Sequence, residues 1–251
     1  MFTVEYPSSL EWAVAEGFKN LLGALSGSLI VSCQPVPGGP FDDPELVVRF
    51  VEAAELGGAR AVRVEGLNNV EAVCRSTTLP VIGLVKRATP GSDVYITPSL
   101  ADIESLAARG VRIVAFDATD RQRAHPVGEM VARIHDLNCL AMADVATTRE
   151  GVAAHGHGAE LVGTTLSGYT DSSPRGHEPD LELVSSLARE GVRVVAEGRI
   201  ATPAQAARAL QNGAFAVTVG TAITRPEWTT RGFARALSES SSPARQEEET
   251  R

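Results

Sequence analysis

The chain has 251 residues, of which 43% are hydrophobic and 22% are charged, and its net charge is −8. This composition is that of a folded globular protein and excludes collagen-like, coiled-coil and disordered chains. The negative charge argues against a surface that neutralises nucleic-acid phosphates, because such proteins carry a basic face. A local site for one phosphate group remains compatible with it.

The cysteines and the apolar runs bear on the compartment. Cys33, Cys74 and Cys139 are odd in number and lie in apolar runs, which favours reduced thiols over disulfides. No run approaches the roughly 18 consecutive apolar residues that span a bilayer, and the first residues lack the pattern of a secretory signal. The sequence therefore predicts a cytoplasmic protein without a membrane span.

The order of elements predicts the fold. Residues 1–28 are interpreted as an N-terminal extension with an amphipathic helix, and the Ser/Glu-rich residues 238–251 as a disordered tail. Between them, over residues 29–237, short β-branched runs alternate about eight times with stretches of helical periodicity, which is typical of parallel βα units. The predicted strands are Leu29–Gln34, Ala61–Glu65, Val81–Lys86, Arg112–Asp117, Leu140–Val145, Leu161–Leu166, Arg193–Glu197 and Ala216–Gly220. We expect a single-domain (β/α)₈ TIM barrel.

An open doubly wound sheet is the alternative architecture. Such a sheet normally carries a glycine-rich turn after its first strand to hold a dinucleotide. Here the first predicted strand is followed by a stiff loop with Pro35, Pro37 and Pro40. The closed barrel is therefore favoured.

Two candidate catalytic residues end predicted strands, where TIM barrels carry their chemistry. Lys86 is one of only two lysines among 23 basic residues. An arginine keeps its proton near neutrality, whereas a partly desolvated lysine can act as a base or a nucleophile. Glu197 follows three apolar residues and can exchange a proton opposite Lys86. The alternative interpretations are that Lys86 stands at a strand end by chance and that Glu197 only forms a salt bridge.

A phosphate site is predicted after the seventh and eighth strands, where TIM barrels often bind phosphate. Its candidate residues are Gly198, Arg199, Gly220, Thr221 and Arg225, with the arginines donating charge-assisted hydrogen bonds. The long loop Tyr169–Pro179 is interpreted as a lid or, alternatively, as a surface excursion. The five histidines lack a metal-binding spacing, so no metal is expected.

Several short motifs follow the predicted strands and loops along the chain. They are Ser32-Cys33-Gln34-Pro35, Arg63-Val64-Glu65-Gly66, Gly83-Leu84-Val85-Lys86-Arg87, Asp117-Ala118-Thr119-Asp120-Arg121, Met142-Ala143-Asp144, Gly163-Thr164-Thr165-Leu166-Ser167-Gly168-Tyr169-Thr170, Glu178-Pro179-Asp180, Ala196-Glu197-Gly198-Arg199 and Val219-Gly220-Thr221-Ala222-Ile223-Thr224-Arg225. Taken together, these motifs resemble the N-acetylmannosamine-6-phosphate 2-epimerases of sialic-acid catabolism.

The resemblance implies an isomerase that interconverts N-acetylmannosamine 6-phosphate and N-acetylglucosamine 6-phosphate without metal or cofactor. It places Lys86 and Glu197 on the catalytic lysine and glutamate of the family. It makes Gln34, Arg63, Asp144 and Arg225 substrate contacts, and we add Thr165 to the substrate-binding set. A homodimer is also expected.

Two other functions remain open from the sequence. Lys86 can be a Schiff-base nucleophile in an aldolase or synthase of the same barrel class, because an amine with a lowered pKa also attacks carbonyls. The barrel can also be a non-catalytic sensor that binds a sugar phosphate.

Overall fold

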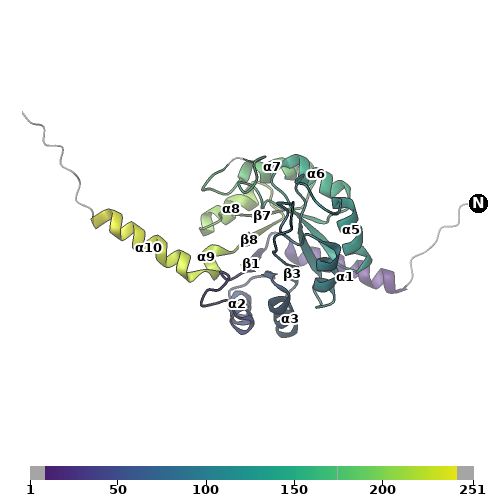
Figure 1. Cartoon of the computed structure of the whole chain (residues 1–251), viewed down its shortest axis with the longest axis horizontal. Coiled ribbons are helices and arrows are strands. Elements are labelled where there is room, and N and C mark those ends of the chain that lie inside the picture. Colours follow the sequence, from purple (N-terminus) through teal and green to yellow (C-terminus); the bar gives the residue numbers. More distant parts are fainter. Residues whose placement is uncertain (1–8, 174, 242–251) are drawn as a thin grey trace, which may run out of the picture.

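The structure, a computed structural model, describes residues 9–173 and 175–241. Eight parallel strands form a closed barrel in which each strand pairs with its neighbours in sequence and β8 pairs with β1 (Figure 1). The strands are β1 Leu29–Cys33, β2 Ala61–Glu65, β3 Val81–Leu84, β4 Ile113–Asp117, β5 Leu140–Asp144, β6 Leu161–Gly163, β7 Val194–Glu197 and β8 Ala216–Val219. The predicted TIM barrel is confirmed.

Several strands are shorter than their apolar runs predict. β3 ends at Leu84, so Lys86 follows the strand and forms an antiparallel bridge with Ile96. β6 ends at Gly163, after which the backbone of Leu166 donates to Val145. Beyond β6, Leu166 belongs to the buried cluster inside the barrel, whereas Val85, beyond β3, belongs to the cluster between the sheet and the helices.

Helices follow the strands around the outside of the barrel: α2 Pro44–Leu56, α3 Leu67–Ser76, α4 Leu100–Ala107, α5 Val127–Asp136, α6 Thr148–Gly156, α7 Leu181–Arg189 and α8 Pro203–Gln211. The starts of several are set by side chains that accept hydrogen bonds from the first free backbone N–H groups. Ser99, Thr147 and Thr202 each form a capping box, and Asp43 caps α2. Each such cap contributes about 1 kcal/mol to helix stability.

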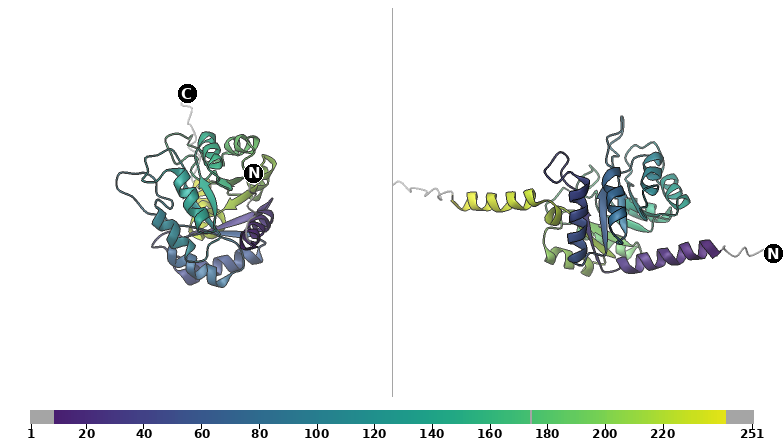
Figure 2. Two further views of the ribbon diagram at one scale, coloured as in Figure 1. Left: turned by 90° about the vertical axis from the view of Figure 1, so that its right-hand side faces the viewer. Right: turned by 90° about the horizontal axis from the view of Figure 1, so that it is seen from below.

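The apolar core has an inner and an outer part. Inside the barrel, Ile30, Ile82, Ile113 and Met142 belong to one buried cluster, while a second cluster lies between the sheet and the helices. At the amino-terminal end of the strands, helix α1 (Ser9–Leu25) packs against the inner cluster (Figure 2). The bottom of the barrel is therefore closed, and the open end is the carboxyl-terminal end of the strands.

The last two helices do not complete the ring. After the short α9 (Thr221–Thr224), helix α10 (Pro226–Ser241) projects away from the barrel (Figures 1 and 2). All residues from 231 to 240 are exposed. Residues 238–241, expected to be disordered, continue this helix, and the rest of the expected tail lies outside the described residues.

The three cysteines are free thiols, and burial raises the pKa of Cys33 to about 12. Within the described part of the chain, no helix is both long enough and apolar enough to cross a membrane.

Candidate active site

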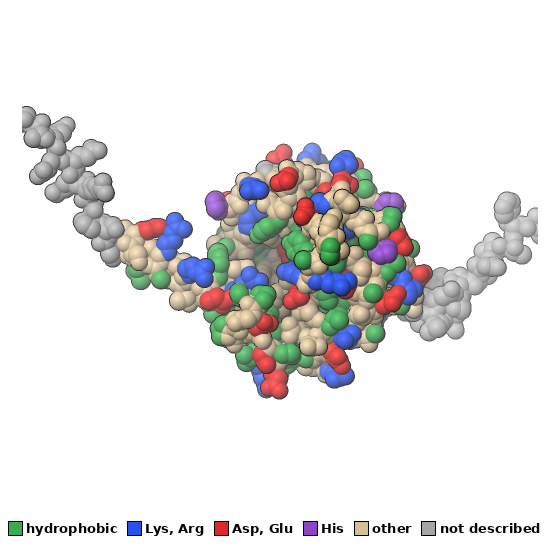
Figure 3. All heavy atoms as spheres, viewed as in Figure 1, with side chains coloured by type: hydrophobic (Ala, Val, Ile, Leu, Met, Phe, Trp, Pro, Cys, Tyr) green, Lys and Arg blue, Asp and Glu red, His purple; other side chains and the backbone are tan. Residues whose placement is uncertain are grey.

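A cavity of about 620 Å³ opens at the carboxyl-terminal ends of the strands. Figure 3 shows the hollow at the middle of this face, with Lys and Arg side chains near its edge. Nearly all of the side chains predicted for the site line this one cavity. They are Gln34, Arg63, Lys86, Thr165, Glu197, Gly198, Arg199, Gly220, Thr221 and Arg225.

Arg63 connects the charged groups at the bottom of the cavity. Its side chain is 1% exposed and forms two hydrogen bonds with Asp144, of 3.0 Å and 2.5 Å. A third hydrogen bond of 2.8 Å joins its Nη1 to Glu197 Oε2. Burial opposes the charge on Arg63, but Asp144 and Glu197 outweigh it and raise the Arg63 pKa. The guanidinium is therefore a fixed positive charge between two carboxylates.

Asp144 lies behind the cavity wall. Its carboxylate is fully buried and also accepts a hydrogen bond of 2.7 Å from the hydroxyl of Thr165. The sequence predicts Asp144 as a substrate contact; in this geometry it holds Arg63 and Thr165, two residues that do line the cavity.

The amine of Lys86 is held by neutral groups. Its Nζ donates to Gln34 Oε1 at 2.6 Å, and Gln34 Nε2 donates to Ser32 Oγ at 2.8 Å. Protein atoms around the amine and the nearby charge of Arg63 lower the Lys86 pKa. A lower pKa increases the fraction of neutral amine at a given pH, which is the form that accepts a proton.

Glu197 ends β7, and the hydroxyl of Thr164 bonds both its backbone N–H and its carbonyl. Its side chain is 12% exposed. Burial raises the pKa of this carboxyl group, and the neighbouring carboxylate of Asp144 raises it further. The cavity therefore contains an amine with a lowered pKa and an acid with a raised pKa, both in the electrostatic field of Arg63, which suits proton transfer at a bound molecule.

The residues predicted to bind phosphate differ in their present partners. Arg225 donates through Nε to the carbonyl of Gln34 at 3.0 Å, and its terminal nitrogens have no hydrogen-bond partner among the described residues. Arg199, in contrast, donates to the carbonyls of Ser167 at 2.6 Å and Glu178 at 2.7 Å. Ser167 lies just before the loop Tyr169–Pro179 and Glu178 near its end, and Tyr169 and Glu178 line the cavity. Arg199 thus joins the two ends of this loop.

Other cavity residues carry no prediction from the sequence. Ser32 and Thr218 project from β1 and β8, and the Thr218 hydroxyl is buried without a partner among the described residues. Tyr95 and Trp228 lie in the connection after β3 and in α10. The alternation of side chains along β8 could have predicted Thr218 as a cavity residue, because Thr218 pairs in register with Glu197. Tyr95 gives no such signal, since its position depends on how a loop folds back.

In the described ranges, no three His, Cys, Asp or Glu side chains converge as a possible metal site.

Comparison with known proteins gives consistent matches. A family described as "Putative N-acetylmannosamine-6-phosphate epimerase" matches residues 47–239. A "Putative N-acetylmannosamine-6-phosphate 2-epimerase" of Proteus mirabilis is 51% identical over 212 residues, covering 84% of this chain and 90% of that protein. One from Klebsiella pneumoniae is 51% identical over 222 residues, with 88% and 94% covered. The solved N-acetylmannosamine-6-phosphate 2-epimerase of Clostridium perfringens has a TM-score of 0.84 at 35% identity, covering 94% of this chain and all of that one.

Proposed function

We propose, from the premise that this chain belongs to the N-acetylmannosamine-6-phosphate epimerase family, that it interconverts N-acetylmannosamine 6-phosphate and N-acetylglucosamine 6-phosphate. The family resemblance predicted from the sequence motifs is confirmed by these matches. The reaction inverts C2, which requires a proton to leave this carbon and to return on the other face.

One observation carries the proposal: Lys86 and Glu197 line the same cavity, together with the buried Arg63, whose guanidinium pairs with Glu197 at 2.8 Å. In the open-chain sugar, C2 lies next to the C1 aldehyde, so its proton is acidic enough for a base to remove. Lys86 Nζ accepts the C2 proton, and the electron pair of the broken C–H bond moves through C1 onto the aldehyde oxygen. Glu197 exchanges protons during ring opening or proton return, and Arg63 is the nearest fixed positive charge for the enediolate.

The phosphate is proposed to lie on the β7–β8 side. Gly198, Gly220 and Thr221 line the cavity there, and Arg225 adds terminal donors that have no partner in the described part of the chain. Arg199 joins this set by exchanging its loop carbonyls for phosphate oxygens. Binding the phosphate far from C2 positions the reacting carbon without direct contact to it. The mechanism uses protein side chains only, without a metal or a cofactor.

Proton NMR in D₂O tests the activity. The wild-type protein incubated with N-acetylmannosamine 6-phosphate is expected to replace the C2 proton with deuterium while the second epimer appears. Lys86→Ala is expected to abolish both signals. Lys19→Ala is the matched control, because Lys19 is the only other lysine and is exposed on α1. Absence of C2 exchange in a folded wild-type protein that binds the sugar would favour the sensor hypothesis.

Borohydride reduction tests the alternative chemistry. If Lys86 formed a Schiff base, reduction in the presence of substrate would attach the sugar covalently to its amine. We expect C2 exchange without covalent labelling, which assigns Lys86 as a base.

We also propose that the protein forms a homodimer through α10. The helix leaves its own barrel and exposes large apolar side chains, with Trp228, Phe233 and Leu237 exposed by 48%, 71% and 68%. Its departure leaves an apolar groove of about 500 Å³ beside β8, lined among others by Leu29, Ala206, Leu210, Val217 and Ile223.

The geometry favours exchange of this helix between two copies. In a complete barrel, a helix after β8 covers the outer face of the sheet at this place. An identical chain supplies a helix of the required apolar character, and a two-fold exchange fills both grooves with the same contact.

A cytoplasmic location, expected from the sequence, agrees with the three free thiols and with a phosphorylated substrate.

A further inference from the structure

Tyr95 lies on the cavity wall, where the connection after β3 places it. The connection doubles back, so that Lys86 and Ile96 form an antiparallel bridge and Arg87 N–H donates to the Tyr95 carbonyl at 3.0 Å. On the other side, Asp117 N–H donates to the Ile96 carbonyl. The backbone of Tyr95 is thus fixed to the same short ribbon that carries Lys86.

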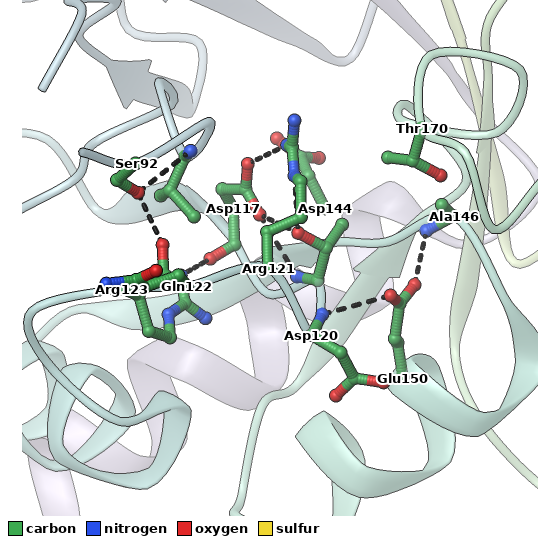
Figure 4. Close-up of polar contacts among 12 residues, drawn as sticks. Ser92, Asp117, Asp120, Arg121, Gln122, Arg123, Asp144, Ala146, Glu150 and Thr170 are labelled. Atoms are coloured by element: carbon green, nitrogen blue, oxygen red, sulfur yellow. Dashed lines mark hydrogen bonds and ion pairs between the residues drawn. The ribbon is translucent and has the colours of Figure 1, made fainter. Parts of the chain in front are cut away.

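The ring of Tyr95 is fixed as well. It packs against the apolar cluster inside the barrel, and the guanidinium of Arg121 lies 5.8 Å from its ring centroid. Arg121 is held by an ion pair with the buried Asp117 and by a hydrogen bond of 2.9 Å to Thr119 (Figure 4). The cation–π contact therefore joins Tyr95 to a side chain that cannot easily move.

The segment behind Arg121 is also anchored. The backbone N–H of Asp120 donates to Glu150, whose carboxylate also accepts from Ala146 N–H (Figure 4). Glu150 is 4% exposed, so this loop is tied to the start of α6 by a buried carboxylate. Such support is typical of a residue whose position matters for binding.

The hydroxyl of Tyr95 is available to a ligand. Among the described residues it has no hydrogen-bond partner, although it belongs to the cavity lining. Burial, together with the carboxylates of Asp144 and Asp117, raises the pKa of the phenol, so it remains a neutral donor at physiological pH. The charged side chains near it are paired with one another, Arg63 with Asp144 and Arg121 with Asp117.

We infer that Tyr95 recognises the N-acyl group of the substrate, its hydroxyl donating to the amide carbonyl and its ring lying against the acyl carbon. The inference rests on the proposed function, in which Lys86 removes the proton from C2. The acylamino nitrogen is bonded to that same carbon, so the group must lie beside Lys86, where the ribbon places Tyr95. A neutral donor on an apolar ring matches a neutral amide that ends in a methyl group.

Calorimetric binding of two sugars tests this assignment. N-acetylglucosamine 6-phosphate carries the acyl group, and glucosamine 6-phosphate lacks it. Tyr95→Phe removes only the hydroxyl and is expected to weaken binding of the acylated sugar by about tenfold, the range of one neutral hydrogen bond. Binding of glucosamine 6-phosphate is expected to change less than about twofold. Turnover during the titration does not matter, because both epimers keep the acyl group.

Tyr169→Phe is the matched control, since Tyr169 also lines the cavity but is 61% exposed. It is expected to leave the preference for the acylated sugar unchanged. Arg121→Gln removes the cation from the Tyr95 ring and is expected to lower the preference by less than Tyr95→Phe. Equal losses for both sugars in Tyr95→Phe, or no loss for either, would overturn the assignment. The proposed function is tested separately, by C2 deuterium exchange in the wild-type protein. The result of that experiment does not depend on which sugar the Tyr95 variants prefer.

Discussion

The Lys86 amine and the Gln34 amide oxygen are 2.6 Å apart, and this contact has a defined direction. Gln34 must present its oxygen to Lys86, because its amide nitrogen donates to Ser32 Oγ at 2.8 Å on the other side. One hydrogen of the Lys86 amine therefore bonds the Gln34 oxygen. In the neutral amine, this bond sets the direction of the other hydrogen and of the lone pair, and the partner that sets it carries no charge. An amide orients the amine without adding the negative charge that would favour its protonated form.

Replacing Gln34 with glutamate should shift the pH dependence of catalysis. Lys86 is proposed to act as a neutral base, so kcat/KM rises with pH through the Lys86 pKa, which burial and Arg63 place below its ordinary value. A carboxylate at position 34 favours the ammonium form and raises that pKa. In Gln34→Glu the rising limb of the pH profile therefore moves to higher pH. For every pH unit that the limb moves, kcat/KM at neutral pH falls about tenfold.

The matched variant Gln34→Met removes the acceptor without adding charge. It is expected to lower kcat, because the amine loses its orientation, and to leave the limb at or below its wild-type pH. An alkaline displacement of equal size in both variants would show that Gln34 does not act on Lys86 through charge.

Asp144→Asn should destabilise the fold as well as the site. Arg63 is 1% exposed, and the substitution removes one of its two carboxylate partners. Leaving a buried charge under-compensated is expected to reduce the free energy of unfolding by about 3 kcal/mol. Glu104→Gln, which breaks the exposed pair with Arg133, is the control and should cost less than about 1 kcal/mol. Urea unfolding of the two variants and the wild type measures both values; similar losses would contradict a special role for the buried pair.

The barrel was predictable because short apolar runs, most of them with β-branched residues, alternate with helical stretches whose starts carry cap residues. The sequence also places Gln34, Arg63, Glu197 and Arg225 at the correct edge, since the carboxyl ends of parallel strands meet on one side. These features depend on local pattern and on one topological rule, so they do not require knowledge of distant contacts.

The remaining features depend on tertiary contacts that no local pattern encodes. The hairpin-like return that brings Tyr95 beside Lys86 is fixed by bonds between residues on β4 and on the connection before α4. Arg199 has a positive φ of 57° and points to the loop carbonyls, although its position after β7 favours phosphate binding equally. The direction of α10 is not encoded locally either, because residues 231–240 are all exposed and do not pack on their own barrel.

Gly168→Ala should release the loop Tyr169–Pro179. Gly168 has a φ of +85°, which disfavours other residues, and an added Cβ would overlap the Arg199 guanidinium. Displacing Arg199 breaks its hydrogen bonds to Ser167 and Glu178. Because Arg175 lies in this loop with an 85% exposed side chain, trypsin cleavage after Arg175 should accelerate by about tenfold in the variant.

Gly176→Ala is the control for this experiment. It lies in the same loop, and an added Cβ meets nothing within 4 Å. Mass spectrometry of the fragments distinguishes cleavage after Arg175 from cleavage elsewhere. If Gly176→Ala accelerates cleavage as much as Gly168→Ala does, Arg199 does not fasten the loop.

Phe233→Asp should separate the proposed dimer into monomers. In one chain the Phe233 side chain is 71% exposed, so aspartate costs little there, but in a groove lined by Leu210, Val217 and Ile223 it would bury an unpaired charge. The dissociation constant is expected to rise at least about a hundredfold, measured by sedimentation equilibrium. Arg235→Asp places the same side chain on the opposite face of α10, where Arg235 pairs with Glu239, and should leave the dimer intact. A monomeric wild-type protein, or equal weakening by both substitutions, would show that the groove beside β8 does not receive the apolar face of a second α10.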